Sequence, residues 1–481
     1  MSQPVADRPP SLPDDLRALA EPPRWLRVAA DASEVTRALR RRVPEIASGG
    51  VDLRACEVRR VRIKSDGCSG LYRVRVRDRE AAPERVIELH GDLIPPGRPP
   101  PQDSAARPFG DPGWRSWLPE LRLVMSLEPP DTALRALPAL MDPAAASRLI
   151  ERAVRRAAPE YADFRVRACR PHVARYKPGS RCTVVYELDL PAGAPARWPR
   201  AVVAKTYHGD KGRTAFDGMR ALWASRLPRA TVAIAEPVGF LAAENVLVQR
   251  VIPHSRTLKE LLCSSLPAAT PDAQGELDAA IERAAHGLAA LHRIGAHADR
   301  TVTWDDHVAE IRELIGRVSG LTSSVAGSAR ALLEQQSRLA AAHPAQPAVP
   351  AHGTFRPAQV VLDGPRIGFI DFDGFCLAEP AMDVALFRAS LRDAGLRALE
   401  AGDRVGADGA GREEGLTLLD AACERFLAVY EQAAPISRRR VALWETGEAL
   451  IAVLHCWTKV KFDRLSYRLA LLQRRLAEVG E

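Results

Sequence analysis

The sequence predicts an α+β chain in which antiparallel sheet comes first and a mainly helical part follows. Residues 62–76 and 175–190 alternate apolar and polar side chains with a period of two, which is typical of half-buried strands. Beyond residue 255 the apolar residues recur at spacings of three and four, which indicates amphipathic helices. An internal similarity indicates that the helix-plus-sheet unit occurs twice before the helical part begins.

The internal repeat covers a helix and the strands after it. DASEVTRALRRRVPEIASGGVDLRAC (residues 31–56) is similar to DPAAASRLIERAVRRAAPEYADFRVRAC (residues 142–169). In each copy, alternating strands follow and then an apolar strand that ends in His-Gly-Asp, at 90–92 and at 208–210. The Pro- and Gly-rich residues 94–113 cannot continue a strand, so we expect a surface loop between the copies. The sequence therefore predicts a duplicated unit.

Helical periodicity fills the C-terminal half. The expected buried positions of its first long helix are Leu277, Ile281, Ala284, Leu288 and Leu291. The same spacing recurs in Leu419, Cys423, Phe426 and Tyr430, and again near the C-terminus. The last apolar stripe has arginines opposite it, and we interpret it as a helix packed on the helical lobe rather than on a membrane surface.

Composition excludes several classes of protein. The 481 residues are 46% hydrophobic and 27% charged, which is ordinary for a globular chain of several cooperative units. The formal charge of +8 is scattered without a basic stripe interleaved with aromatics, so we expect no nucleic-acid partner. Neither a signal peptide nor a membrane span is recognisable. Eight cysteines without ligand-like spacing indicate reduced, mostly buried thiols and a cytoplasmic location.

The residues that could carry chemistry lie in AHGTFRPAQVVLDGPRIGFIDFD, residues 351–373. Residues 360–362 lead into an Asp-Gly turn, and residues 366–370 return as a second strand. A hairpin brings the start of its first strand beside the end of its second, so Gln359 and Asp371 are expected to converge. An amide oxygen and a carboxylate at one point are what a phosphate-bound Mg²⁺ requires.

This segment resembles the aminoglycoside phosphotransferase and choline kinase family, whose motifs are HGDxxxxN, a hairpin, an IDFD-like magnesium motif and DPxxDLA. His352-Gly353-Thr354 stands in the first position, Gln359 in the asparagine position and Asp371 in the magnesium position. EPAMDVA supplies Asp383, which we expect to anchor the catalytic loop by accepting backbone hydrogen bonds. The resemblance implies a bilobal protein-kinase-like fold and an ATP-dependent phosphotransferase that acts on a hydroxyl of a small molecule. ATP is the expected nucleotide, with GTP left open, and Mg²⁺ the expected metal.

The resemblance extends backward to the sheet that precedes the motif. Lys205 ends an apolar strand where the family places the lysine that contacts the α- and β-phosphates, and Asp217 on the next helix is the candidate for its acidic partner. Residues from Gln249 to Ile252 resemble the hinge that holds adenine by backbone hydrogen bonds. Gly179 and Ser180 form a hairpin tip suited to covering phosphates.

Thr354 is the main departure from the family pattern. The family has an aspartate there, which orients the substrate hydroxyl, and general-base assistance is worth roughly 10²- to 10⁴-fold. Three hypotheses are consistent with Thr354. The first is an active phosphotransferase in which Asp373 takes the orienting role. The second is a pseudokinase that binds nucleotide or a small molecule and regulates a partner, and the third is a scaffold with neither activity. His352 is included among the candidate catalytic residues, although a structural role is expected for it.

The predicted domains are residues 1–130, a degenerate copy of the kinase-like N-lobe; residues 131–253, the N-lobe itself; and residues 254–481, the helical C-lobe. The N-terminal copy lacks a lysine in the strand before His90. We therefore expect that this copy does not hold ATP by the same contacts and that it could serve as a surface for a protein partner.

Overall fold

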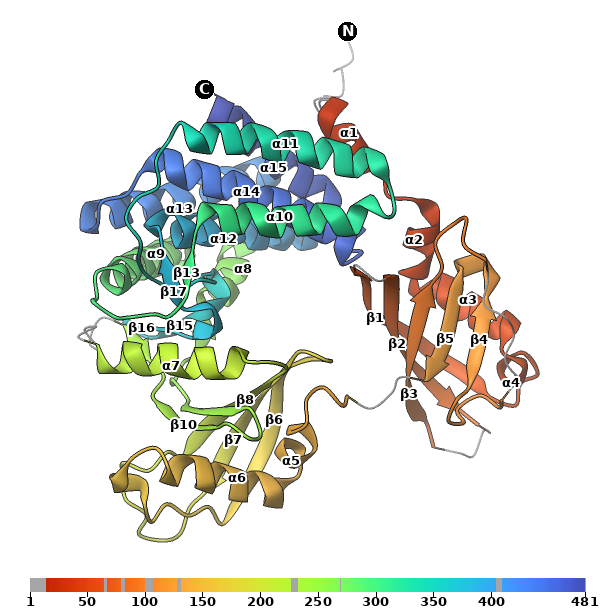
Figure 1. Ribbon diagram of the computed structural model, residues 1–481, viewed down its shortest axis with the longest axis horizontal. Coiled ribbons are helices and arrows are strands. Elements are labelled where there is room, and N and C mark those ends of the chain that lie inside the picture. Colours follow the sequence, from red (N-terminus) through yellow and green to blue (C-terminus); the bar gives the residue numbers. More distant parts are fainter. Residues whose placement is uncertain are drawn as a thin grey trace. The chain divides into compact units, whose positions relative to one another are not determined.

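The computed structural model describes residues 14–64, 67–78, 83–99, 107–127, 131–225, 232–268, 270–403 and 409–480 (Figure 1). The chain forms two compact units. The first contains Met1–Pro130, Asp305–Ala342 and Thr446–Glu481, and the second contains Asp131–Trp304 and His343–Glu445. Residues 100–106 of the predicted surface loop lie outside the described residues.

The first unit contains a five-stranded antiparallel sheet in the order β1-β2-β3-β5-β4. Its strands are β1 (Asp52–Lys64), β2 (Gly67–Arg77), β3 (Arg85–Leu93), β4 (Arg115–Leu118) and β5 (Leu123–Leu127). The N-terminal helices are α1 (Asp14–Ala20), α2 (Arg24–Ala29), α3 (Ala32–Arg42) and α4 (Pro44–Ala47). The later helices of this unit are α10 (Trp304–Ser319), α11 (Ser323–Ala341), the C-terminal part of α14 (Arg438–Thr458) and α15 (Leu465–Gly480).

The second unit begins with another five-stranded antiparallel sheet, in the order β10-β11-β8-β7-β6. Its strands are β6 (Ala168–Lys177), β7 (Arg181–Asp189), β8 (Ala201–Tyr207), β10 (Pro237–Leu241) and β11 (Val246–Arg250). Helices α5 (Leu137–Met141) and α6 (Pro143–Arg155) precede the sheet, and α7 (Lys211–Ala224) follows β8. In both sheets three consecutive strands form a meander, and the last strand of the five inserts beside the third.

The same two kinds of hydrogen bond occur within each of the two helix-plus-sheet units. The main helix before each sheet starts at an aspartate whose carboxylate accepts backbone N–H groups, Asp31 for α3 and Asp142 for α6. A tyrosine on the second strand of each sheet donates to a carbonyl of the preceding short helix: Tyr72 to Ala29 at 2.9 Å and Tyr186 to Leu140 at 2.6 Å. Both tyrosines are fully buried, so each hydroxyl needs such a partner.

The rest of the second unit is mainly helical. Helices α8 (Leu258–Ala268) and α9 (Pro271–His292) contact the hairpin of β15 (Val360–Asp363) and β16 (Arg366–Phe369). Helices α12 (Pro380–Asp403) and α13 (Gly409–Ala433) pack against α8 and α9. The hairpin lies in a small sheet between β12 (Arg256–Thr257) and β9 (Ala233–Ile234). A second small sheet joins β13 (Thr301–Val302), β17 (Cys376–Ala378) and β14 (Val349–Ala351). The predicted apolar positions of α9 and α13 are buried, which confirms the helical periodicity and the α+β class.

Residues after the Pro-rich stretch form two short strands, β4 and β5. None of the eight cysteines is in a disulfide, and six of them are buried. Among the described residues, no helix has the length and apolar character needed to cross a membrane.

Candidate active site

The loop that carries His352 is anchored by Asp383 at the start of α12. The Asp383 carboxylate accepts the backbone N–H groups of His352 at 2.6 Å and Gly353 at 3.0 Å, and His292 Nε2 lies 3.2 Å from it. Burial alone would raise the pKa of Asp383, but the His292 hydrogen bond and the charges around it lower that pKa. Asp383 therefore holds the loop as an anion, which confirms the anchoring role predicted from EPAMDVA.

The surroundings of His352 fit a role in holding the loop in place. Its Nε2 lies 3.1 Å from the carbonyl oxygen of Ile370, and its ring packs against Phe355 and Phe372. The side chain is fully buried, and burial lowers the pKa of His352 even though Asp383 and Asp371 act in the opposite direction. A neutral imidazole that binds backbone positions the loop, as expected; a catalytic role for His352 stays a prediction.

Gly353 brings this loop into backbone contact with the Asp-Phe-Asp segment. Its φ is +76°, and a Cβ built at this position would lie 1.9 Å from the carbonyl oxygen of Gly374. A Cβ on Gly374 would in turn lie 2.8 Å from Thr354 Cγ2. Only glycine allows the two segments to approach so closely.

We expect Gly353→Ala to lower the free energy of unfolding by about 3 kcal/mol or more, because the change adds a backbone clash to the cost of positive φ. Gly364→Ala in the turn of the β15–β16 hairpin is the matched control, since its φ is +56° and no atom lies within 4 Å of the added Cβ. That control should cost only about 1 to 2 kcal/mol. Urea denaturation of both variants measures the difference, and equal losses would contradict the close approach.

The hairpin brings Gln359 and the Asp371 segment together as predicted. The backbone N–H of Ile370 donates to the carbonyl of Gln359 at 3.0 Å. Gln359 Nε2 donates to Thr354 Oγ1 at 3.1 Å, whereas Gln359 Oε1 is buried and has no hydrogen-bond partner among the described residues. A buried amide oxygen without a partner is costly, so this atom is a candidate ligand for a cation.

Lys205 on β8 forms a buried ion-pair cluster with the Asp-Phe-Asp carboxylates. Its Nζ lies 2.8 Å from Asp371 Oδ1 and 3.0 Å from Asp373 Oδ1. The exposed fractions of these side chains are 7% for Lys205, 21% for Asp371 and 13% for Asp373. Residues more than 160 positions apart in the sequence are thus joined directly. The sequence placed Lys205 and Asp371 in one site, and the structure brings them into contact.

Two further members of the cluster were missed by the sequence analysis. Arg181, the first residue of β7, contacts Asp373 at 2.5 Å and Asp371 at 3.4 Å. Tyr207 donates from its hydroxyl to Asp373 Oδ1 at 2.9 Å. The sequence positions of both residues could have indicated that they belong to the site. Arg181 follows the predicted phosphate-covering tip, and Tyr207 lies two residues after Lys205 and therefore on the same face of β8.

The contacts within this cluster shift the pKa values of its members. Burial alone would lower the pKa of Lys205, but Asp371 and Asp373 raise it; burial alone would raise the pKa of Asp371, but Lys205 and Arg181 hold it well below its usual value. Burial and Asp373 raise the pKa of Tyr207. Lys205 and Asp371 are thus both charged at neutral pH. Asp371 also has a φ of +69°, a strained conformation of the kind found at functional sites.

The remaining predicted site residues lie outside this cluster. Asp217 is half-buried on α7, and the carboxylates that contact Lys205 are Asp371 and Asp373 rather than Asp217. Gln249 is buried on β11, and its Oε1 has no hydrogen-bond partner among the described residues. The carbonyl of Ile252 lies 2.8 Å from His254 Nδ1.

The hairpin tip between β6 and β7 has its backbone N–H groups engaged. Gly179 N–H donates to Asp131 Oδ2 at 2.8 Å, and Ser180 N–H donates to the carbonyl of Lys177 at 3.0 Å. Tyr176 donates from its hydroxyl to the same Asp131 oxygen at 2.8 Å. A phosphate covered by this tip would therefore have to replace Asp131.

The fold of the second unit is protein-kinase-like. Its antiparallel five-stranded sheet supplies a buried lysine, its His-Gly loop is anchored, and its hairpin ends in paired carboxylates. Residues 200–418 match the family model described as the phosphotransferase enzyme family, APH. This match confirms the predicted resemblance for that part of the chain.

Several solved structures are similar to this chain. One is a glucosamine kinase in complex with glucosamine, ADP and inorganic phosphate (16% identity, 70% of this chain and 86% of that chain covered, TM-score 0.45). Others are the ADP-bound aminoglycoside phosphotransferase APH(2'')-Ib (14%, 66% and 97%, 0.43) and an ethanolamine kinase of Plasmodium vivax (12%, 63% and 82%, 0.38). At these identities and TM-scores, the similarities say nothing about what this chain binds. A comparison with curated proteins finds no match.

Proposed function

We propose that the second unit is an ATP-dependent phosphotransferase that acts on a hydroxyl group of a small molecule. The observation that carries this proposal is the contact of Lys205 Nζ with Asp371 Oδ1 at 2.8 Å. Phosphoryl transfer depends mainly on positioning and charge neutralisation, and this pair supplies one cation for the phosphates and one anion for their metal. Arg181 adds a second cation beside the same carboxylates.

The side chains at the hairpin fit Mg²⁺. Asp371 offers carboxylate oxygens, and Gln359 offers the buried Oε1 that lacks a hydrogen-bond partner among the described residues. Mg²⁺ is usually held by one or two carboxylates together with nucleotide phosphates, so a larger protein ligand set is unnecessary. Among the described residues, no group of three or more His, Cys, Asp or Glu side chains could hold a metal. When bound, Mg²⁺ would neutralise charge on the transferred phosphoryl group.

Asp373 is the group of this site that could orient the acceptor hydroxyl. It accepts hydrogen bonds from Lys205, Arg181 and Tyr207. If nucleotide phosphates bind Lys205 and Arg181, these two side chains no longer donate hydrogen bonds to the Asp373 carboxylate. The carboxylate can then accept a proton or a hydrogen bond from the substrate hydroxyl. Tyr207 would keep it in position.

Thr354 favours a second candidate function, a pseudokinase that binds nucleotide and regulates a partner. The Thr354 hydroxyl occupies the position of the family's aspartate and accepts from Gln359 Nε2, with His352 Nδ1 at 3.3 Å. A hydroxyl cannot serve as an anion there, and losing general-base assistance costs roughly 10²- to 10⁴-fold in rate. Nucleotide binding by Lys205 and Asp371 does not depend on that residue.

Titration of the full chain with MgATP, followed by thermal unfolding and by phosphate release on the same sample, tests both functions. We expect binding in the wild type and its loss in Asp371→Ala. Asp363→Ala is the matched control, because this exposed carboxylate lies on the same hairpin away from Lys205. Phosphate release that disappears in Asp373→Asn supports the phosphotransferase. Binding without release supports the pseudokinase, and the absence of binding contradicts both.

The cytoplasmic location predicted from the sequence stays a prediction, and the same holds for the three domain boundaries.

A further inference from the structure

The strand registers relate the two sheets residue by residue. In each sheet the second strand carries the buried tyrosine that donates to a preceding carbonyl, and a cysteine lies four residues before that tyrosine. Counted from the two cysteines, Ser69 of β2 corresponds to Thr183 of β7. Ser69 pairs with Asp92 of β3, and Thr183 pairs with Lys205 of β8. Asp92 therefore occupies the position that Lys205 holds in the second unit.

This register changes the match suggested by the sequence. There, His-Gly-Asp at 90–92 was matched to His-Gly-Asp at 208–210. The first triplet lies inside β3, whereas the second follows the end of β8. The position of the expected phosphate-binding lysine thus carries an acid in the first unit.

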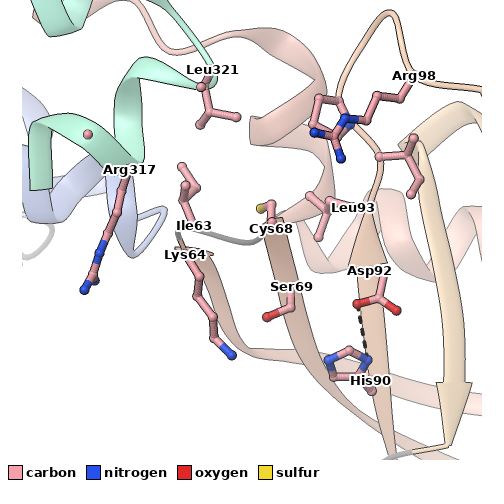
Figure 2. Close-up of a pocket in the computed structure, with 15 residues that line it drawn as sticks. Ile63, Lys64, Cys68, Ser69, His90, Asp92, Leu93, Arg98, Arg317 and Leu321 are labelled. Atoms are coloured by element: carbon pink, nitrogen blue, oxygen red, sulfur yellow. Dashed lines mark ion pairs between the residues drawn. The ribbon is translucent and has the colours of Figure 1, made fainter. Parts of the chain in front are cut away.

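Two more positions near the proposed phosphate site differ between the sheets. The residue before the cysteine is Arg181 in the second sheet and Gly67 in the first. The residue that pairs with the cysteine is Tyr176 in the second sheet and Ile63 in the first. Figure 2 shows Ile63 on β1 and Asp92 on β3 of the first sheet. A sheet of this kind therefore forms without an arginine or a tyrosine at these positions, and its framework does not explain them.

Asp131 and Lys205 lie on opposite faces of the second sheet. Asp131 Oδ2 accepts a hydrogen bond from the Tyr176 hydroxyl at 2.8 Å, and Tyr176 pairs with the buried core residue Cys182. Burial raises the pKa of the Cys182 thiol, and the nearby Asp131 charge raises it further. Lys205 pairs with Thr183, the next residue of the same strand. Because successive side chains of a strand point to opposite faces, Asp131 lies on the core side and Lys205 on the proposed nucleotide side.

The tip of the β6–β7 hairpin is a turn with two accessible conformations. The Lys177 carbonyl accepts from the Ser180 N–H at 3.0 Å, Pro178 is the second residue, and Gly179, the third, has a φ of +69°. These are the features of a type II turn. A type I turn differs in the central peptide group: ψ of the second residue changes from about +120° to about −30°, and φ of the third from about +80° to about −90°. Both turns keep the hydrogen bond between the first and fourth residues, so the flanking strands can stay in place.

The direction of the Gly179 N–H distinguishes the two turns. In the structure it donates to Asp131 Oδ2 at 2.8 Å, on the face opposite Lys205. Rotation of the central peptide group turns this donor to the Lys205 face, where a backbone N–H can bind a phosphate oxygen. Asp131 Oδ1 accepts from the N–H groups of Ala133 and Leu134 at 3.2 and 3.3 Å, so its own segment holds the carboxylate in place. Asp131 thus stabilises the turn that directs the donor away from the nucleotide side.

We propose that Asp131 is a positioning residue that holds the tip in a conformation unable to bind phosphate, and that nucleotide binding requires rotation of the Pro178–Gly179 peptide group. This inference rests on the proposed function of the second unit. Asp131 and a nucleotide phosphate compete for one N–H group, so the apparent affinity for nucleotide is reduced by the fraction of molecules in which Asp131 holds it.

Isothermal titration of the full chain with MgATP tests the proposal, with thermal unfolding as the check that each variant folds. We expect Asp131→Ala to bind MgATP about tenfold more tightly than the wild type, because a hydrogen bond to a charged group no longer favours the type II turn. Asp131→Asn keeps an acceptor for the Gly179 N–H and should gain less than Asp131→Ala. A simple structural role for Asp131 would not strengthen nucleotide binding.

Gly179→Ala is an independent variant of the same turn. No atom lies within 4 Å of the added Cβ, but an alanine disfavours the positive φ of the type II turn. We therefore expect Gly179→Ala to bind MgATP more tightly as well. If the glycine were needed in its present conformation to cover the phosphates, the same change would weaken binding, and that result would overturn the proposal.

Asp189→Ala is the matched control, since Asp189 is an exposed acid at the opposite end of β7 from the tip. It should leave the affinity unchanged. An equal gain in Asp189→Ala indicates a general effect of negative charge and contradicts the role of Asp131. Wild-type or weaker affinity in Asp131→Ala, while the wild type binds MgATP, contradicts that role alone. The absence of MgATP binding in both the wild type and Asp131→Ala contradicts the proposed function of the second unit as well.

Discussion

Thr354→Asp is expected to raise the rate of phosphate transfer from MgATP roughly 10²- to 10⁴-fold, because it restores an anion at the position where the substrate hydroxyl is oriented. The surroundings suit a carboxylate: Gln359 Nε2 already donates to this side chain at 3.1 Å, and the residue is half-buried. Product formation at saturating MgATP, with a panel of small hydroxyl compounds, measures the gain.

Thr354→Asn is the control with nearly the same shape and no charge, and it should give no gain. The result also identifies the orienting group in the wild type. If Thr354→Asp leaves the rate unchanged while Asp373→Asn abolishes it, Asp373 already performs the task and the expected gain is wrong. If neither variant transfers phosphate but both bind MgATP, the pseudokinase is the better description.

Lys205→Met is expected to lower the free energy of unfolding by about 3 to 5 kcal/mol, since it leaves Asp371 and Asp373 with less compensation in a buried site. Urea denaturation at neutral pH measures the loss. Lys211→Met is the control, because this lysine is exposed at the start of α7. The double variant Lys205→Met/Asp371→Asn should lose less than the sum of the single losses, as expected for residues in direct contact. Additive losses would contradict an energetic coupling between the two side chains.

The pH dependence of that loss follows from the two pKa shifts. The pKa of Asp371 is lowered in the folded state, so its stabilisation is present above the unfolded value of about 3.9 and is lost as the pH falls through the folded value. The pKa of Lys205 is raised, so its stabilisation is present below about 10.4 and is lost as the pH rises through the folded value. The difference between wild type and Lys205→Met should therefore be level between about pH 5 and 9 and shrink outside that range.

Local signals account for the parts of the site that the sequence predicted. The β15–β16 hairpin follows from apolar strands on both sides of an Asp-Gly-Pro turn, and the buried faces of α9 and α13 follow from helical periodicity. Asp383 was assigned its anchoring role from the motif EPAMDVA, and its two backbone hydrogen bonds confirm that role. Each of these features depends on a short stretch of chain or on a motif of fixed spacing.

The spacing of residues along the sequence did not predict which side chains contact Lys205. The sequence offered Asp217, twelve residues away on the next helix, whereas the contacts are made by Asp371 and Asp373, and Arg181 and Tyr207 join them. The choice among carboxylates depends on which one the packed lobes bring within hydrogen-bond distance, and no local rule carries that information.

The sequence by itself was enough to identify the motif at 351–373, the helical and strand periodicities, and the similarity between residues 31–56 and 142–169. The tertiary structure decided which charges meet and in what register the two sheets correspond. A side-chain period of two cannot fix how the strands of one sheet match those of another, because insertions in loops shift the numbering without changing the pleat. The hydrogen-bonded ladders fix that match, and they place Asp92 at the position of Lys205.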